Sequence, residues 1–133
     1  MPHEPHYPNR DDMEVPLLRA LLALGGSIRF SVRGRQIEEM LADHFKLSKE
    51  ERDFASPNYH SEGNRKWRNH IQFVRDQLVK RGELDNSKHG YWVIAVAGYR
   101  RLGVEAPPNA PDMRHVKPKV TRAEIRRSIL DQL

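Results

Sequence analysis

Basic and amide side chains are concentrated between residues 65 and 81, where six Lys or Arg residues accompany one acid, Asp76. Guanidinium and ammonium groups bind phosphate oxygens, and Arg, Asn and Gln can form paired hydrogen bonds with base edges in the major groove. We therefore expect this stretch, the loop before it and a later polar turn to bind double-stranded DNA. The expected contact residues are Tyr59, Arg65, Lys66, Trp67, Arg68, Asn69, Gln72, Lys88 and His89.

The expected roles differ within this set. The basic residues at the start of the stretch are expected to hold phosphates or bases, and the amides of Asn69 and Gln72 are expected to read base edges. Lys88 and His89, in the later turn, are expected to approach an adjacent groove or the DNA backbone.

Residues for catalysis or metal binding do not form a recognisable pattern. The chain has no cysteine, and its seven histidines include no helical pair with a third ligand nearby, as a zinc site requires. Pro111-Asp112 is similar to the first half of a PD-(D/E)xK nuclease site, but the downstream Glu124-Ile-Arg126 has Arg where Lys is needed. We expect no catalytic residue, no metal and no cofactor in this chain.

The net charge of +5 is unevenly distributed. Residues 1–54 contain 8 Lys or Arg against 10 Asp or Glu, whereas residues 55–133 contain 15 against 8. This asymmetry indicates a polyanion-binding surface built mainly from the second half. No apolar run approaches the roughly 18 residues of a membrane span, and the first residues lack the apolar region of a secretory signal. We expect a soluble cytoplasmic protein.

An apolar stripe predicts how the basic stretch is held. Trp67, Ile71, Val74 and Leu78 recur at steps of four, three and four, which is typical of a helix with one buried face. This helix is expected over residues 65–81, with Asn64 as its N-cap and Gly82 just after its end. Because Trp67 continues the stripe, it either packs in the core or faces DNA, and the sequence leaves both open.

The remaining elements give the order of a winged helix-turn-helix fold. The sequence predicts a helix over 13–24, an extended segment over 27–32, a helix over 35–45, a helical start capped by Ser48, a loop over 55–64, the basic helix, a hairpin over 83–95 and a short helix over 97–104. The fold class is therefore mainly α with a small β-hairpin wing (α+β), and the hairpin is the wing.

Four regions are expected along the chain. Residues 1–12 form a flexible arm, residues 13–104 the winged-helix domain, and residues 105–120 a Pro-rich linker. Residues 121–133 start a C-terminal helix that leads to a further, absent domain.

One stretch also carries a family resemblance. It comprises Asn69-His-Ile-Gln-Phe-Val-Arg-Asp-Gln-Leu78-Val-Lys-Arg-Gly82-Glu-Leu84, with Gly90-x-Trp92-x-Ile94 after it. It resembles the N-terminal winged-helix domain of Mrr-type (modification-dependent) restriction endonucleases, over about residues 13–104. The loop at 58–64 does not align with the family, and the wing tip is particular to this chain.

The resemblance implies a DNA-targeting module followed by a nuclease domain of the PD-(D/E)xK or HNH type. It also implies reading of methylated DNA, such as N6-methyladenine, which requires an apolar surface in the major groove. Trp67, Tyr59 and Phe73 are the candidates for that surface, although we expect Phe73 to pack against the wing or the helix over 35–45.

Two other functions stay open. A winged-helix transcription regulator would dimerise, and the helix over 121–133 could serve that purpose. A protein-interaction module is disfavoured by the six basic residues against one acid in the stretch over 65–81.

Overall fold

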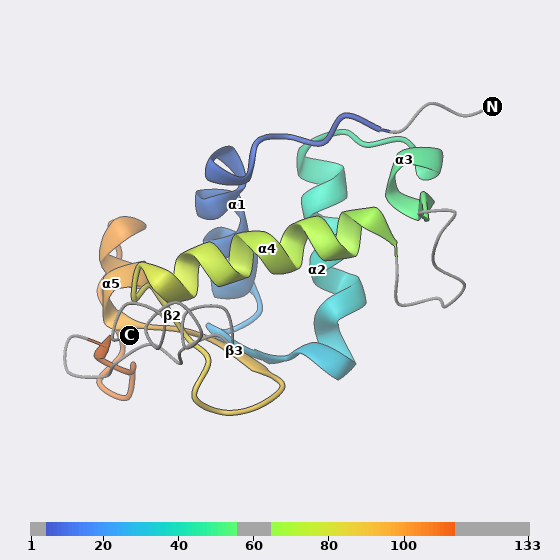
Figure 1. Cartoon of the computed structure of the whole chain (residues 1–133). Helices are drawn as coiled ribbons and strands as arrows, with labels where there is room; N and C mark the ends of the chain where they lie inside the picture. Colours follow the sequence, from blue (N-terminus) through green and yellow to red (C-terminus); the bar gives the residue numbers. More distant parts are fainter. Residues whose placement is uncertain (1–4, 56–64, 114–133) are drawn as a thin grey trace, which may run out of the picture.

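The computed structural model describes residues 5–55 and 65–113. Within them lie α1 (Arg10–Ala23), β1 (Ser27–Arg29), α2 (Phe30–His44), α3 (Lys49–Asp53), α4 (Lys66–Lys80), β2 (Leu84–Asp85), β3 (Tyr91–Ile94) and α5 (Val96–Arg101) (Figure 1). The structure is mainly helical with a small antiparallel sheet, so the predicted fold class is confirmed, and the elements follow the winged-helix order. No helix of the described residues is long and apolar enough to cross a membrane.

The sheet has the order β1-β3-β2, so the last strand of the hairpin lies in the centre. Ile28 of β1 pairs with Trp92, and Leu84 of β2 pairs with Ile94. These four side chains are buried, as the alternation along a half-buried strand requires. The turn between β2 and β3 is therefore the wing tip, and it projects away from the helices (Figure 1).

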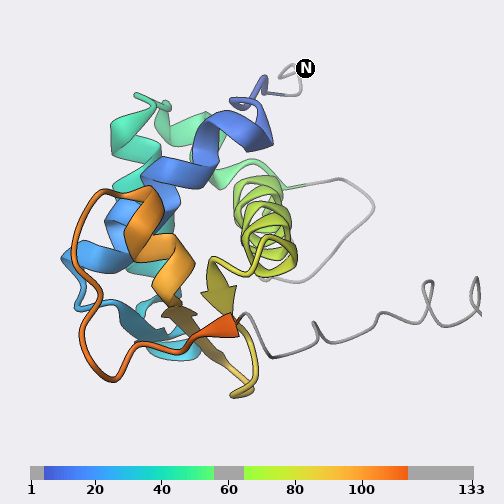
Figure 2. The ribbon, with the colours of Figure 1, turned by 90° about the vertical axis from the view of Figure 1, so that its left-hand side faces the viewer.

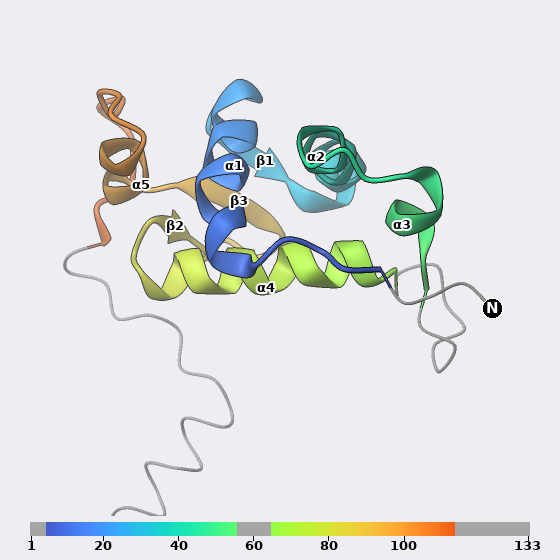
Figure 3. The same cartoon turned by 90° about the horizontal axis from the view of Figure 1, so that it is seen from above.

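Helix α4 forms along its predicted apolar stripe. Trp67, Ile71, Val74 and Leu78 are fully buried, and the helix crosses α1 and α2 (Figures 1 and 3). At its end, the Gly82 amide donates to the Val79 carbonyl, and the next amide donates to the Leu78 carbonyl, both at 2.9 Å. This Schellman arrangement needs the positive φ of +73° that Gly82 adopts, so the predicted helix end is confirmed.

Two local predictions concern helix starts. The capping box at Ser48 is confirmed, because its hydroxyl accepts from the Glu51 amide and the Glu51 carboxylate accepts from the Ser48 amide. The N-cap position of α4 is held by Arg65, whereas Asn64, the predicted cap, lies outside the described residues.

Helix α1 begins at Arg10, three residues before the predicted start, so part of the expected arm is helical. Pro16 consequently lies in the second turn of the helix and not in the first. The preceding residues pack on the domain: the Tyr7 ring lies 5.0 Å from the Trp67 ring, and its hydroxyl donates to the Glu51 carbonyl at 2.7 Å.

The prediction of an extended segment over 27–32 was wrong beyond Arg29, because α2 already begins at Phe30. The Phe30 amide donates to the Gly90 carbonyl at 2.8 Å, and its ring stacks on Trp92 at 4.4 Å. These contacts end the strand and turn the chain into the helix. Val32, expected to alternate inward, is 69% exposed.

The chain after α5 also packs more closely than a linker would. Ala106 and Ala110 lie against the core, and the Val96 amide donates to the Pro111 carbonyl at 2.8 Å. The short helix predicted over 97–104 is α5, which ends at Arg101. The helix predicted over 121–133 lies outside the described residues.

Candidate nucleic-acid interface

One face of α4 is turned away from the rest of the described structure. Figures 2 and 3 show α1, α2 and α5 on one side of α4, and no described helix or strand on the other. By helical spacing, the side opposite the buried stripe carries Asn69, Gln72, Phe73, Asp76 and Lys80. We call these five residues the outward face. It brings together the two amides that the sequence predicted to read base edges.

The edge of α4 next to the wing carries two arginines stacked on aromatic rings. The Arg68 guanidinium lies 4.7 Å from the centre of the Phe30 ring, and the Arg75 guanidinium lies 5.7 Å from that of Trp92. Phe30 and Trp92 stack on each other with an angle of 9° between their planes. Such cation–π contacts restrain a guanidinium while its N–H groups stay available to another acceptor. Arg75, which also pairs with Asp76 at 2.9 Å, was missing from the predicted site.

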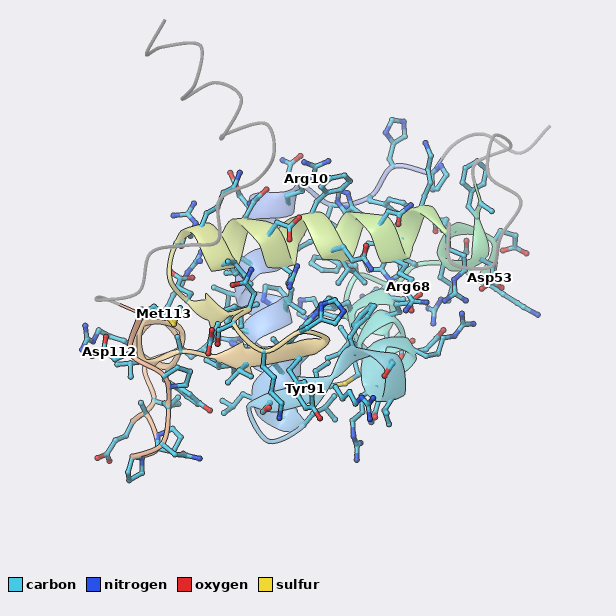
Figure 4. All side chains as sticks on the ribbon, turned by 60° about the horizontal axis from the view of Figure 1, so that its bottom comes forward. Arg10, Asp53, Arg68, Tyr91, Asp112 and Met113 are labelled. Atoms are coloured by element: carbon cyan, nitrogen blue, oxygen red, sulfur yellow. The ribbon has the colours of Figure 1, made fainter. Side chains whose placement is uncertain are left out.

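The opposite edge of α4 also carries a cation. The Arg10 guanidinium of α1 lies 4.3 Å from the centre of the Phe73 ring, and Figure 4 shows Arg10 and Arg68 on opposite sides of α4. Phe73 is 49% exposed, so the expectation that it packs against the wing or α2 was wrong. The outward face is thus flanked by arginines along both edges.

Arg65 does not belong to this exposed surface. Its guanidinium forms an ion pair with Glu38 of α2 at 2.8 Å, where the side chain of Arg65 is 19% exposed and that of Glu38 only 4%. Burial raises the pKa of the Glu38 carboxyl group, and the charges of Arg68 and Arg35 act in the opposite direction. Arg65 thus neutralises a buried carboxylate, and its predicted contact with DNA stays a prediction.

Trp67 is also removed from the candidate surface. Its side chain is fully buried, and its indole N–H donates to the Glu38 carbonyl oxygen at 2.9 Å. A ring without exposed area cannot contact a base, so the core alternative holds. Tyr59, the other predicted aromatic contact, lies outside the described residues.

The wing adds positive charge beside α4. The Lys88 ammonium group lies 4.1 Å from the centre of the Tyr91 ring, and both Lys88 and His89 are exposed at the tip. Arg29, which is exposed on β1, pairs across the sheet with Tyr91, the wing residue labelled in Figure 4. Arg29 was not among the predicted contacts, because only the strand register reveals its neighbour.

Lys66 occupies the first turn of α4, as predicted. Its ammonium group lies 6.0 Å from the centre of the Phe54 ring, which belongs to the segment just after α3. This position keeps the charge near the N-terminal end of the helix, where amide N–H groups also favour anions.

A buried carboxylate anchors the other end of α4. Glu14 of α1 is 1% exposed and accepts hydrogen bonds from Gln77 and Arg81 at 3.0 Å, and it pairs with Arg101 of α5 at 2.9 Å. Burial alone would raise the pKa of Glu14, but the hydrogen bonds from Gln77, Arg101 and Arg81 outweigh it and hold the pKa below its usual value. Arg81 thus holds the end of α4 against α1 through its ion pair with Glu14.

Within residues 5–55 and 65–113, no group of three or more His, Asp or Glu side chains could hold a metal ion.

Comparison with known proteins supports the family resemblance that the sequence carries. The family model described as the Mrr N-terminal domain matches residues 11–103. No curated protein and no solved structure matches the chain. The match gives no support to a transcription regulator. Because the family model covers well over half of the sequence, the chain belongs to the Mrr N-terminal domain family.

Proposed function

We propose that this chain is the DNA-targeting module of a restriction endonuclease and that α4 enters the major groove of duplex DNA. The observation that carries the proposal is the outward face of α4, where amides that can read bases lie between two edges that carry arginines. An α-helix is about 10–12 Å wide and the major groove about 12 Å, so phosphates lie along both sides of an inserted helix.

The contacts divide according to this geometry. Arg68 and Arg75 on the wing edge and Arg10 on the other edge meet phosphates, whereas Asn69 and Gln72 meet base edges. The phosphate contacts of the arginines position the helix on the duplex. They carry no sequence information, because phosphates are the same in every sequence. Specificity then rests on the outward face.

The wing extends the contact beyond α4. The exposed charges of Arg29 and Lys88, together with His89, lie beside the hairpin that adjoins the helix. In a winged helix bound to DNA, this hairpin meets the backbone or the adjacent groove. We assign these residues to sequence-independent contacts.

We also propose that the domain recognises methylated DNA, such as N6-methyladenine, in the major groove. A methyl group there is apolar and has to meet an apolar side chain. Cleavage belongs to a separate nuclease domain. Support for both comes from the resemblance to modification-dependent restriction endonucleases.

The test is binding of the chain to fluorescent duplexes of mixed sequence, followed by anisotropy between 50 and 200 mM salt. We expect binding that weakens steeply as salt rises. Arg68→Glu should abolish most of it. Arg19→Glu, at an exposed position half a turn around α1 from Arg10, changes the net charge equally and should have little effect. Absence of binding at 50 mM salt, or equal losses for the two variants, would refute the assignment of α4.

Methyl reading has its own arm in this experiment. Duplexes with adenines methylated at N6 are compared with unmethylated duplexes of the same sequences. Tighter binding to the methylated set supports the reader function. Equal affinity across all sequences removes that function and leaves DNA binding intact.

A further inference from the structure

Phe73 is an unusual residue on the outward face of α4. It is 49% exposed, and among the described residues only Val32 and Val104 are other large apolar side chains with comparable exposure. Burying a Phe side chain contributes about 1.5–3 kcal/mol, and here much of that contribution is not realised within the domain. Single exposed apolar residues are common on protein surfaces, so the position of this ring has to carry the argument.

That position is the middle of the outward face. Phe73 lies four residues after Asn69 and three before Asp76, and residues at these spacings share one side of a helix. The ring therefore stands next to the amide that the proposed function assigns to base reading. Any groove that accepts Asn69 also receives the Phe73 ring.

A neighbouring cation holds the ring in place. Arg10 covers the ring with its guanidinium 4.3 Å from the ring centre, and Arg10 is itself exposed in the first turn of α1. A cation–π contact of this kind limits the motion of the ring and leaves its remaining surface open. The pair thus presents an apolar surface with a positive charge at its edge.

The apolar ring of Phe73 beside the charge of Arg10 is complementary to a methyl group on a base edge in the major groove. Thymine exposes a C5-methyl group there, and methylated adenine or cytosine exposes a methyl group on the same side of the base pair. We propose that Phe73 is the specificity-determining contact by which α4 recognises a methyl group on a base edge, with Arg10 holding the ring and meeting the adjacent phosphate. This inference rests on the proposed entry of α4 into the major groove.

The experiment starts from a library of duplexes with a randomised centre, from which the full chain selects its preferred sequences. The selected duplex is then prepared in four forms: unmodified, with uracil in place of thymine, with N6-methyladenine, and with 5-methylcytosine. Affinities are measured for the unaltered chain and for Phe73→Ala, Phe73→Leu, Arg10→Gln and Val104→Ala.

Contact with one methyl group is expected to change affinity about fourfold. If thymine supplies the methyl group, the unaltered chain loses about fourfold on uracil duplexes. If a modified base supplies it, the chain gains about fourfold on that form. In either case Phe73→Ala should bring the ratio close to one, and Phe73→Leu, which keeps an apolar side chain, should retain most of it.

The other variants separate apolar reading from charge and from general surface effects. Arg10→Gln should weaken every duplex, because it removes a phosphate contact, and it should lower the salt slope by about 0.9. Val104→Ala, which truncates a similarly exposed apolar side chain beyond α5, should change nothing. Thermal unfolding of each variant checks that the domain stays folded.

Two results would overturn the inference: no methyl dependence in the unaltered chain, or an unchanged methyl ratio in Phe73→Ala, which includes equal weakening of all four forms by that variant. Each of them leaves binding of DNA by α4 standing. Loss of all binding at low salt would instead refute the proposed function, and the role of Phe73 with it.

Discussion

Two arginines three positions apart on α4 have opposite surroundings. Arg65 pairs its guanidinium with the buried carboxylate of Glu38, whereas the guanidinium of Arg68 lies over the Phe30 ring. The same side chain therefore stabilises the fold at one position and faces a prospective ligand at the other. What separates them is that only Arg65 forms an ion pair with the buried carboxylate, whereas Arg68 acts on it through its charge alone.

We predict that Arg65→Ala and Arg68→Ala affect different measurements. Arg65→Ala leaves the Glu38 carboxylate buried without its partner and should lower the free energy of unfolding by about 3 kcal/mol in urea titrations. Arg68→Ala removes a charge that acts on Glu38 without an ion pair, so it should lower the free energy of unfolding less than Arg65→Ala and weaken DNA binding about 5- to 10-fold. If both variants lowered stability alike, the division of roles would be incorrect.

A second residue-scale prediction separates base reading from phosphate binding. Asn69→Ala should cost about 1–3 kcal/mol on the preferred duplex and relax the preference at one base pair. Lys66→Ala should weaken all duplexes to the same extent. Selection from a randomised library checks both, and an unchanged sequence preference in Asn69→Ala would contradict base reading by the outward face.

At the scale of elements, α4 depends on α1 for its position. Glu14 ties α1 to the last turn of α4 and to α5 through three cationic or amide partners. The sequence contained a signal for this role, since Glu14 shares the buried side of α1 with Leu18 and Leu21 at helical spacing. An acid within an apolar stripe needs buried partners, but the sequence did not show which ones.

The lowered pKa of Glu14 gives the element a pH dependence. A carboxylate whose pKa is lower in the folded state contributes stability that is fully present above its unfolded value, about 4.3, and lost as pH falls through its folded value. Glu14→Gln should therefore lower the free energy of unfolding by about 1–3 kcal/mol at pH 7, and the difference from the unaltered chain should shrink below about pH 4. Urea titrations at pH 7, 5, 4 and 3 measure it, and a difference independent of pH would contradict the assignment.

The elements also show how far the sequence could predict the structure. The stripe of α4 was predictable because burial repeats at a local spacing that Trp67 and Leu78 obey. The start of α2 was not, because the alternation of Ile28 and Phe30 is typical of a strand. Phe30 enters a helix through its contacts with Gly90 and Trp92, some sixty positions away, and local patterns do not contain such contacts.

The candidate site was also predictable only where it depends on local spacing, and not where it depends on contacts between distant residues. Its location on α4 and the amides of its outward face came from residue type and helical spacing. The ion pair of Arg65, the burial of Trp67 and the ring contacts of Arg10 and Arg75 depend on which distant side chain each one meets. Tertiary packing therefore decided the membership of the site.

At the scale of the whole molecule, several separate elements supply the positive surface around α4. Arg10 comes from α1, Arg29 from β1, and Lys88 from the wing, so no single peptide segment reproduces it. Each phosphate contact releases counterions, and the logarithm of affinity falls with that of salt by about 0.9 per contact.

We predict that Arg10→Gln and Arg68→Gln each reduce this slope by about 0.9 and together by about 1.8, whereas Arg19→Gln leaves it unchanged. Anisotropy titrations at four salt concentrations measure the slopes, and a single variant that removed most of the slope would contradict a distributed surface.

The short connection between α4 and the wing has a geometric consequence for any duplex that the domain binds. Three residues separate Lys80 from Leu84, two of their amides are fixed by the Schellman bonds, and the Glu83 carbonyl accepts from the Ala95 amide at 3.0 Å. Helix and hairpin therefore behave as one rigid body with a constant offset. A rigid body of this kind would contact DNA at two places with a constant spacing between them, and that spacing would not depend on the base sequence between the two places.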